Sequence, residues 1–259
     1  FTTTTNYDLA NIRLTYTAAI EMADSLGLKE EANHWRNQLS EWPEFAVDHT
    51  GLTIAPGYPL SESHRHFSHM LAFHPFGLLD VSQGPGIERL IKRSIHHAEE
   101  MGPDLWVGYS YAWLANMKAR TFDGDGTSRA LHIFIKAFCA PNSFHLNGDQ
   151  LQKGYSSFTY RPFTLEGNFA CASALQEMLL QSHTGIIHIF PALPESWQDA
   201  SFQNLRAMGA FTVSANYESG KIQKVIIHSE KGGLLKVKNP FTNKIEERMT
   251  HAGETIELS

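Results

Sequence analysis

The feature of this sequence that most constrains its fold is a change in the spacing of apolar residues near residue 185. Up to His183, apolar residues recur at three- and four-residue intervals, as they do on the buried side of an α-helix. From Phe202 onward they alternate with polar residues, which is typical of half-buried strands joined by turns. The sequence therefore predicts a mainly α-helical domain over residues 1–185 and a small antiparallel β-sandwich over residues 186–259.

Individual elements follow from this periodicity and from start and stop signals. Helices are expected over residues 7–26, 30–42, 64–78, 106–120 and 128–138, with further helices beginning at Pro85 and just after Glu166. Strands are expected over residues 185–190, 211–217, 222–228, 234–237 and 255–258. Residues 123–126, Asp-Gly-Asp-Gly, are expected to form a plain turn, because the later Glu of a calcium loop is absent. The irregular stretch 142–162 is long for a compact domain, which is typical of functional loops.

Composition excludes several classes of partner. The 259 residues carry a net charge of −6 and no long basic block, which disfavours binding to nucleic acid or to an anionic membrane surface. No stretch has the pattern of a transmembrane helix or of a secretory signal. The chain begins at Phe1 without Met, so we expect it to be a piece of a longer protein. Cys139 and Cys171 are expected to be buried free thiols, with a disulfide between them as the alternative if they lie close together.

Glu166 stands where an extended segment meets a predicted helix, within Arg161-Pro-Phe-Thr-Leu-Glu-Gly-Asn-Phe169. A carboxylate among Phe163, Leu165 and Phe169 favours a functional role, because charged groups are seldom placed among apolar residues without a reason. The alternative is that Glu166 or Asn168 only caps the helix and stabilises it through the helix dipole.

A second polar cluster lies upstream in Ser61-Glu-Ser-His-Arg-His-Phe-Ser-His69. Two histidines flanking Arg65 before an apolar run favour a pocket for a hydroxyl-rich or anionic ligand. The spacing lacks the Glu of the zinc protease signature, and there is no Cys-x-x-Cys pair, so no metal is predicted. No organic cofactor is predicted either.

Several segments, in order along the chain, resemble glycoside hydrolase family 95. Residues 64–70 are similar to the family's His-Arg-His-x-Ser-His-Leu segment, and residues 108–113 to its Gly-Trp-Ser-x-Ala-Trp segment. Residues 166–169 are similar to its Asp-Gly-Asn-Phe segment and residues 177–183 to its Glu-Met-Leu-Leu-Gln-Ser-His segment. Residues 190–197 are similar to its Leu-Pro-Ala-Leu-Pro-x-x-Trp segment. The resemblance implies a fold built on an (α/α)6 barrel. It also implies a glycosidase, because characterised members are mainly α-L-fucosidases with some α-L-galactosidases.

The resemblance further implies an inverting mechanism, in which an acid protonates the glycosidic oxygen and a base on the other face activates water. In this family the aspartate of the Asp-Gly-Asn segment polarises a water that asparagine side chains hold. Glu166 stands in its place, with the same charge on a longer side chain. By the same resemblance His66, Arg65, His64 and Asn168 would bind sugar. Tyr109 and Trp113 would form a pocket wall, although core packing explains Trp113 equally well.

The family's general acid lies in a Ser-Pro-Glu-Asn segment that has no counterpart here. Six or seven predicted helices are about half of the twelve in an (α/α)6 barrel. We therefore expect the C-terminal half of a barrel followed by the β-sandwich. Such a half would expose apolar surface for a second copy of the chain or for the N-terminal half.

The expected substrate is an oligosaccharide or glycan with a terminal α-L-fucoside or related sugar, and an extracellular or periplasmic location follows from the resemblance alone. One alternative is a noncatalytic carbohydrate-binding or structural module. Another is a different (α/α)6 enzyme, such as a disaccharide phosphorylase. It would need an anion site, for which the sequence offers Arg65, Arg161 and the helix start near Asn168.

Overall fold

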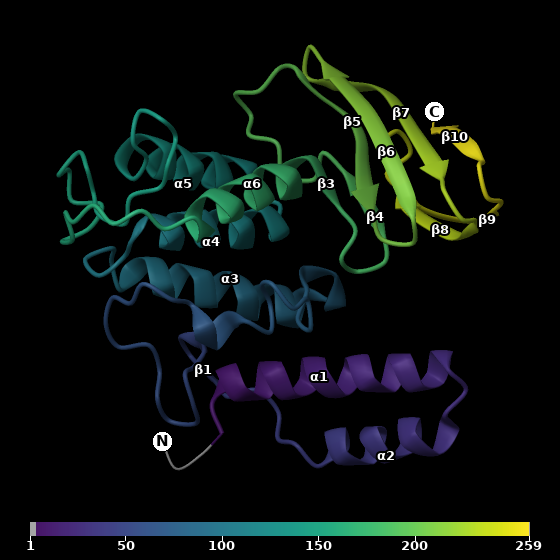
Figure 1. Cartoon of the computed structure of the whole chain (residues 1–259), viewed down its shortest axis with the longest axis horizontal. Coiled ribbons are helices and arrows are strands. Elements are labelled where there is room, and N and C mark those ends of the chain that lie inside the picture. The colour runs from purple at the N-terminus through teal and green to yellow at the C-terminus, as the bar shows by residue number, and fades with distance from the viewer. Residues whose placement is uncertain (1–3, 259) are drawn as a thin grey trace. The chain divides into compact units, whose positions relative to one another are not determined.

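The computed structural model describes residues 4–258, which form a helical part followed by a domain of strands (Figure 1). The chain divides into two compact units. One contains the described residues up to Ser110 together with Asn147–Arg161, and the other contains Tyr111–Leu146 together with the described residues from Pro162 onward. The last three helices, apart from the first residues of the earliest one, thus belong to the same unit as the C-terminal strands. Among the described residues, no helix is long and apolar enough to span a membrane.

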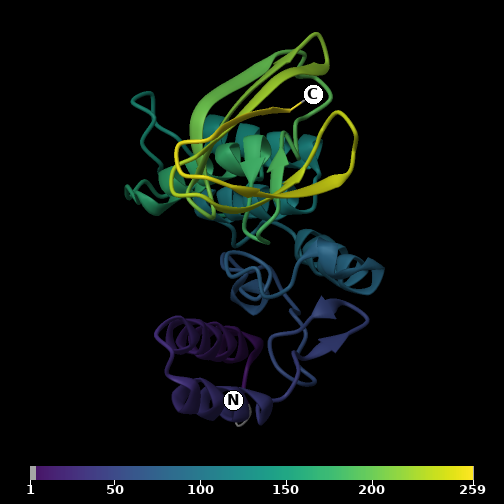
Figure 2. The same ribbon diagram turned by 90° about the vertical axis from the view of Figure 1, so that its right-hand side faces the viewer.

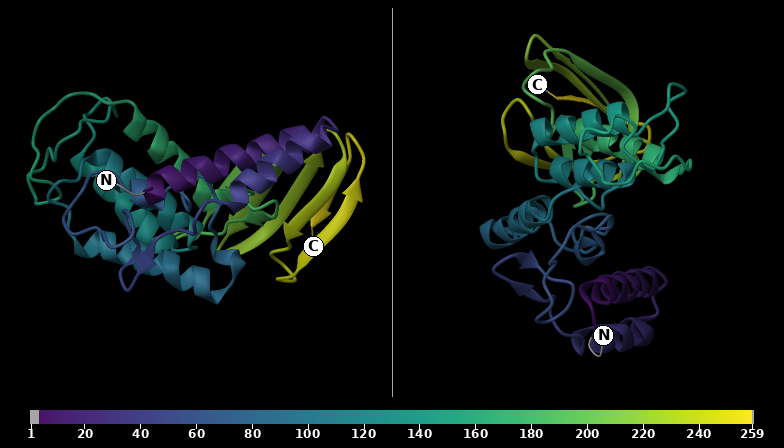
Figure 3. Two further views of the ribbon diagram at one scale, coloured as in Figure 1. Left: turned by 90° about the horizontal axis from the view of Figure 1, so that it is seen from below. Right: turned by 90° about the vertical axis from the view of Figure 1, so that its left-hand side faces the viewer.

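The first unit begins with a helical hairpin of α1 (Asn6–Ser25) and α2 (Lys29–Ser40), which lie side by side (Figures 1 and 3). Thr5 caps α1, because its hydroxyl accepts from the Asp8 N–H while the Asp8 carboxylate accepts from the Thr5 N–H. The Asn6 side chain is fully buried and donates to the carbonyls of Ala46 and Thr53. This amide ties the start of α1 to the short strands that follow α2.

Those strands are β1 (Val47–Asp48) and β2 (Gly51–Leu52), and β2 packs against α3 (Pro85–Glu100). Ser94 of α3 accepts a hydrogen bond from the Leu52 N–H at 2.8 Å. A Cβ on Gly51 would lie 2.3 Å from Ser94 Oγ, and Gly51 has a φ of +119°, so glycine is required there. As predicted, Pro85 opens α3, where its missing N–H costs nothing.

The predicted helix over residues 64–78 is wrong, because this stretch holds only turns and the 3₁₀ turn η1 (Ser68–Met70). Pro75 has no N–H for a helical bond and disfavours helical backbone at His74. A side-chain bond also competes with the helix, since His64 Nδ1 accepts from the His66 N–H at 3.1 Å. A second 3₁₀ turn, η2 (Val81–Gln83), precedes α3.

The second unit contains most of α4 (Gly108–Arg120), with α5 (Gly124–Ala137) and α6 (Glu166–Leu179). Residues 123–126 are not the plain turn that we predicted. Asp123 is the N-cap of α5, and its carboxylate accepts from the Gly126 N–H at 2.7 Å. Gly124 already belongs to the helix, where a Cβ would lie 2.2 Å from the Leu193 carbonyl oxygen.

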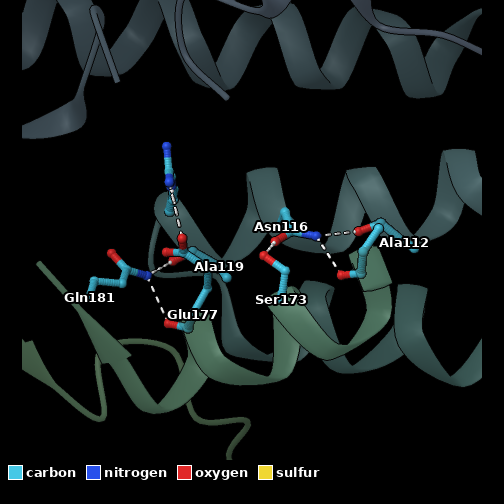
Figure 4. Close-up of polar contacts among 8 residues, drawn as sticks. Ala112, Asn116, Ala119, Ser173, Glu177 and Gln181 are labelled. Atoms are coloured by element: carbon cyan, nitrogen blue, oxygen red, sulfur yellow. Dashed lines mark hydrogen bonds and ion pairs between the residues drawn. The ribbon is translucent and has the colours of Figure 1, made fainter. Parts of the chain in front are cut away.

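Buried polar contacts join α4 to α6 (Figure 4). Asn116 donates to the carbonyls of Ala112 and Ala170 and accepts from the Ser173 hydroxyl at 2.8 Å. One turn further on, the Gln181 amide donates to the carbonyls of Ala119 and Glu177. Gln181 thereby satisfies one carbonyl near the C-terminal end of each helix, and these bonds fix α6 against α4.

The C-terminal strands form the predicted sandwich, with two four-stranded sheets lying face to face (Figure 2). The first sheet has the order β10-β7-β6-β5, made of β5 (Ala200–Ala207), β6 (Phe211–Glu218), β7 (Lys221–Ser229) and β10 (Thr255–Leu258). The second has the order β3-β4-β8-β9, made of β3 (Leu180–Gln181), β4 (Ile187–Ile189), β8 (Gly233–Lys238) and β9 (Ile245–Thr250). All pairs are antiparallel except β4 with β8. Buried residues of both sheets share one core, including Ile187, Val213, Val225, Ile227 and Val237.

Candidate active site

The residues predicted for the site fall in both units. His64, Arg65, His66 and Tyr109 belong to the first unit, and Trp113, Glu166 and Asn168 belong to the second.

The histidine cluster is held at the surface by a buried neighbour. Phe67 is fully buried and packs edge to face against Trp106, with ring centroids 5.4 Å apart. The Ser110 hydroxyl donates to the Arg65 carbonyl at 2.7 Å, which fixes the backbone beside Phe67. His64 and His66 flank these anchors and are exposed, with ring centroids 5.6 Å apart.

A pocket of about 270 Å³ lies beside this cluster in the first unit. Its polar lining residues are Thr5, Ser61, Glu62, His64, His66, Ser68 and His69, and its apolar ones include Ile54 and Leu60. Pockets for drug-sized ligands span roughly 300–1,000 Å³, so this volume suits one small ring better than a long chain. Two of the three predicted residues of the cluster thus share this pocket, whose surface is mostly apolar but carries several polar side chains.

His69 also lines this pocket and was missed, although it is the last histidine of the cluster quoted from the sequence. Burial, with smaller contributions from the nearby His97 and His64, lowers the pKa of His69 to about 4. The ring is therefore neutral at pH 7 and has one hydrogen-bond donor and one acceptor.

Arg65 is not among the residues that line the pocket. Its guanidinium lies 5.9 Å from the centroid of the Phe158 ring, within range of a cation–π interaction. Phe158 belongs to the irregular stretch 142–162, where Asp149 is fully buried and its carboxylate accepts from four backbone N–H groups. Arg65 therefore contacts an ordered loop.

Tyr109 and Trp113 both lie on α4. Tyr109 is half-buried, whereas Trp113 is 6% exposed. The burial of Trp113 favours core packing over a place in a pocket wall.

Glu166 is the first residue of α6, and its side chain is exposed. The N-cap is Leu165, whose apolar side chain makes no capping hydrogen bond. Asn168 does not cap it either, because its Oδ1 accepts from the His145 N–H at 3.0 Å and its Nδ2 donates to the Ser143 carbonyl at 2.8 Å. A carboxylate in the first turn of a helix is favoured by the helix dipole.

Exposed apolar side chains surround Glu166 in sequence and on the neighbouring loop. Phe144 and Phe163 stack with centroids 4.7 Å apart and planes at 23°. Leu165 and Phe169 are 45% and 65% exposed. Large exposed apolar groupings on proteins often lie at contact surfaces.

His145, which the sequence did not single out, lies beneath the start of α6. It is fully buried, and its Nδ1 lies 2.7 Å from the Thr164 carbonyl oxygen and 2.9 Å from Thr164 Oγ1. Burial lowers the pKa of His145, although the Thr164 hydrogen bond and the Glu166 charge act in the opposite direction. The ring packs beside Phe134, with centroids 5.2 Å apart.

Two further sets of side chains bear on the predictions. Cys139 and Cys171 are free, as expected, but half-buried rather than buried. Burial raises the pKa of Cys139 to about 11, so its thiol is protonated and unreactive at neutral pH. In residues 4–258 no three His, Cys, Asp or Glu side chains are grouped as they would be around a metal ion.

Comparison with known proteins supports the resemblance drawn from the motifs. Residues 1–179 match the family model for the glycosyl hydrolase family 95 catalytic domain, and residues 181–258 match the glycoside hydrolase family 95 C-terminal domain. The protein called alpha-L-fucosidase 2 of Arabidopsis thaliana is 28% identical over 168 residues, which are 64% of this chain. The chain spans about a fifth of the length of that relative, since the match covers 19% of it. With both of its parts matched, this chain belongs to glycoside hydrolase family 95.

Proposed function

We propose that this chain carries part of an inverting glycosidase that removes terminal α-L-fucosides or related α-linked sugars from glycans. The observation that carries the proposal is Glu166, an exposed carboxylate at the start of α6, in the segment that resembles the family's Asp-Gly-Asn-Phe. The family supports a glycosidase. The name of the Arabidopsis relative supports an α-L-fucoside as the substrate.

In the proposed reaction a general acid gives its proton to the glycosidic oxygen as the bond from that oxygen to the anomeric carbon breaks. Water attacks the anomeric carbon from the opposite face, which inverts the configuration, and the proton of this water passes to the Glu166 carboxylate. Glu166 polarises this water and stabilises the positive charge that develops on it. Its place in the first turn of α6 puts its negative charge where the helix dipole favours it.

The pocket beside the histidine cluster is proposed to bind one sugar. Its neutral His69, together with His64 and His66, offers donors and acceptors to hydroxyl groups. Arg65 is proposed to support the site through its contact with Phe158, and Tyr109 to border it. That Asn168 binds sugar stays a prediction, because both polar groups of its side chain already have protein partners.

We propose that catalysis also needs residues outside this chain. No counterpart of the family's Ser-Pro-Glu-Asn segment occurs among these residues, and the chain covers only a fifth of the Arabidopsis relative. Residues 1–185 would then be the C-terminal half of an (α/α)6 barrel, and residues 186–259 the β-sandwich domain. The exposed side chains around Glu166 would contact the other half or a second copy. An extracellular or periplasmic location is part of the same proposal.

The test is the release of free L-fucose and L-galactose from α-linked glycosides by the full-length protein. Glu166→Gln keeps the shape but removes the charge, and we expect it to lower kcat at least about a hundredfold. Glu218→Gln, an exposed glutamate at the end of β6, is the matched control and should leave turnover unchanged. Turnover by the Glu166→Gln variant at the level of this control would reject the role of Glu166.

A noncatalytic carbohydrate-binding module is the second candidate, which the pocket beside the histidine cluster favours because it needs no general acid to bind a sugar. It predicts that the full-length protein binds L-fucosides, as titration calorimetry would measure, but releases no sugar. Turnover by the full-length protein would exclude it.

A further inference from the structure

We propose that His145 is a positioning residue that sets the start of α6 and thereby the place of the Glu166 carboxylate. The effect of His145 on catalysis rests on the proposed function. The contacts by which it positions Glu166 involve only residues of the second unit. It assigns a role to a buried polar side chain that the proposed reaction does not itself use.

The first support is that one residue holds both sides of Glu166 in the sequence. The His145 carbonyl accepts from the Thr164 N–H at 3.3 Å, and its ring contacts the Thr164 carbonyl at 2.7 Å. On the other side, the His145 N–H donates to the Asn168 side chain at 3.0 Å. Thr164, two residues before Glu166, and Asn168, two residues after it, thus both form hydrogen bonds with His145.

The second support is the close approach of Gly167. A Cβ added there would lie 2.3 Å from His145 Nδ1 and 2.7 Å from two ring carbons. Gly167 is buried and lies within the first turn of α6, where its φ is not in the left-handed region. The glycine is therefore explained by the imidazole that lies against it and not by a strained turn.

The third support is that the start of α6 lacks the usual side-chain cap. Its N-cap residue, Leu165, makes no capping hydrogen bond, and the Asn168 side chain near the helix start bonds instead to residues 143 and 145. Within residues 4–258, the buried His145 Nε2 has no hydrogen-bond partner. Leu or Phe would fill the same space without an unpaired buried nitrogen, so the Nδ1 edge toward Thr164 is what histidine adds.

Two nearly isosteric variants separate the two edges of the ring. In His145→Asn the side-chain NH₂ takes the place of Nδ1 and keeps a donor for the Thr164 carbonyl. In His145→Gln the amide reaches toward the place of Nε2 and loses that donor. We expect hydrogen exchange of the Thr164 and Asn168 amides to be about tenfold faster in His145→Gln and within threefold of wild type in His145→Asn.

This measurement needs no turnover, so it judges the role of His145 even if the proposed function fails. Equal exchange at Thr164 and Asn168 in His145→Gln and wild type would overturn the proposal. If His145→Gln does not fold, Gly167→Ala gives the same test from the other side. Its Cβ must displace the ring, and unchanged exchange at these two amides would again overturn the proposal.

The catalytic consequence is tested in the full-length protein by separating kcat from KM. Displacing Glu166 by about 1 Å should lower kcat of His145→Gln about a hundredfold with KM nearly unchanged, while His145→Asn stays within tenfold of wild type. Equal kcat values for both variants and wild type would contradict the positioning role. Sugar release by neither wild type nor variants would count against the proposed function alone, and the exchange data would then decide.

Discussion

Replacing Glu177 by Ala should destabilise the protein much more than replacing a glutamate of an exposed ion pair. Glu177 of α6 accepts from Arg120 at the end of α4, at 3.0 Å from Nη2 and 3.3 Å from Nε. The Arg120 and Glu177 side chains are only 8% and 16% exposed. Glu177→Ala therefore removes a carboxylate from a largely buried guanidinium.

The expected loss in the free energy of unfolding is about 3 kcal/mol, at the lower end of the range for breaking a buried ion pair by removing one partner. For a chain of this size that corresponds to a fall in melting temperature of roughly 6–12 °C. Replacing both residues at once, as in Arg120→Met with Glu177→Leu, should recover most of the loss because no buried charge remains.

The matched control is Glu230→Ala in the second unit. Glu230 accepts from Arg206 at 2.9 Å, but the Arg206 and Glu230 side chains are 75% and 33% exposed. Exposed pairs contribute about 0–1 kcal/mol. Urea unfolding, followed by circular dichroism, gives both losses on one scale. A loss for Glu177→Ala no larger than that for Glu230→Ala would refute the reasoning.

Three further outcomes are expected. The pKa of His69 falls from 6.5 in the unfolded chain to about 4 in the folded one, so the unfolded chain binds the extra proton first as the pH is lowered. About 3 kcal/mol of stability should therefore be lost as the pH falls from 6.5 to 4. His69→Gln should flatten this part of a urea-unfolding pH series, and an unchanged pH dependence of stability in this variant would contradict the assignment. Asp149→Asn replaces an oxygen that accepts from two backbone N–H groups with an NH₂ donor, and it should lower the free energy of unfolding by at least about 3 kcal/mol. The control Asp199→Asn should lower it by less than about 1 kcal/mol, because that carboxylate accepts from one exposed N–H. Gly124→Ala should lower the melting temperature by several degrees, because its Cβ would meet the Leu193 carbonyl; an unchanged melting temperature would contradict this contact.

Most helices could be predicted because their apolar residues share one side and their ends carry recognisable signals. Pro85 opens α3, and α1 and α2 end within two residues of the predicted positions. The failure over residues 64–78 shows the limit of periodicity. Phe67, Met70 and Phe73 recur every three residues, but they are buried in a turn-rich segment.

Among the sandwich strands that the sequence did not predict, β5 and β9 were missed for opposite reasons. β9 is an edge strand in which Glu246, Glu247 and Arg248 are exposed, so it lacks the apolar alternation of a half-buried strand. β5 does alternate at first, but a register shift between Phe202 and Leu205 interrupts the pattern. Neither feature changes the sandwich, because the core strands carry clear alternation.

The candidate site was only partly visible in the sequence. The motifs at 64–70 and 166–169 brought His64, His66 and Glu166 to attention because they are polar groups beside apolar runs. His145 was missed because nothing near it in sequence marks it. It meets Thr164 and Asn168 only through folding, across about twenty intervening residues. Asn168 looked like a cap or a ligand for sugar, and only the structure shows its bonds to the loop at 143–145.

The most direct test of the account is the configuration of the sugar first released by the full-length protein. Proton NMR during early turnover of an α-L-fucoside distinguishes the two anomers before they equilibrate. An inverting reaction must give β-L-fucose first, and this is the result that we predict. α-L-fucose appearing first would contradict the proposed reaction and the place of Glu166 in it.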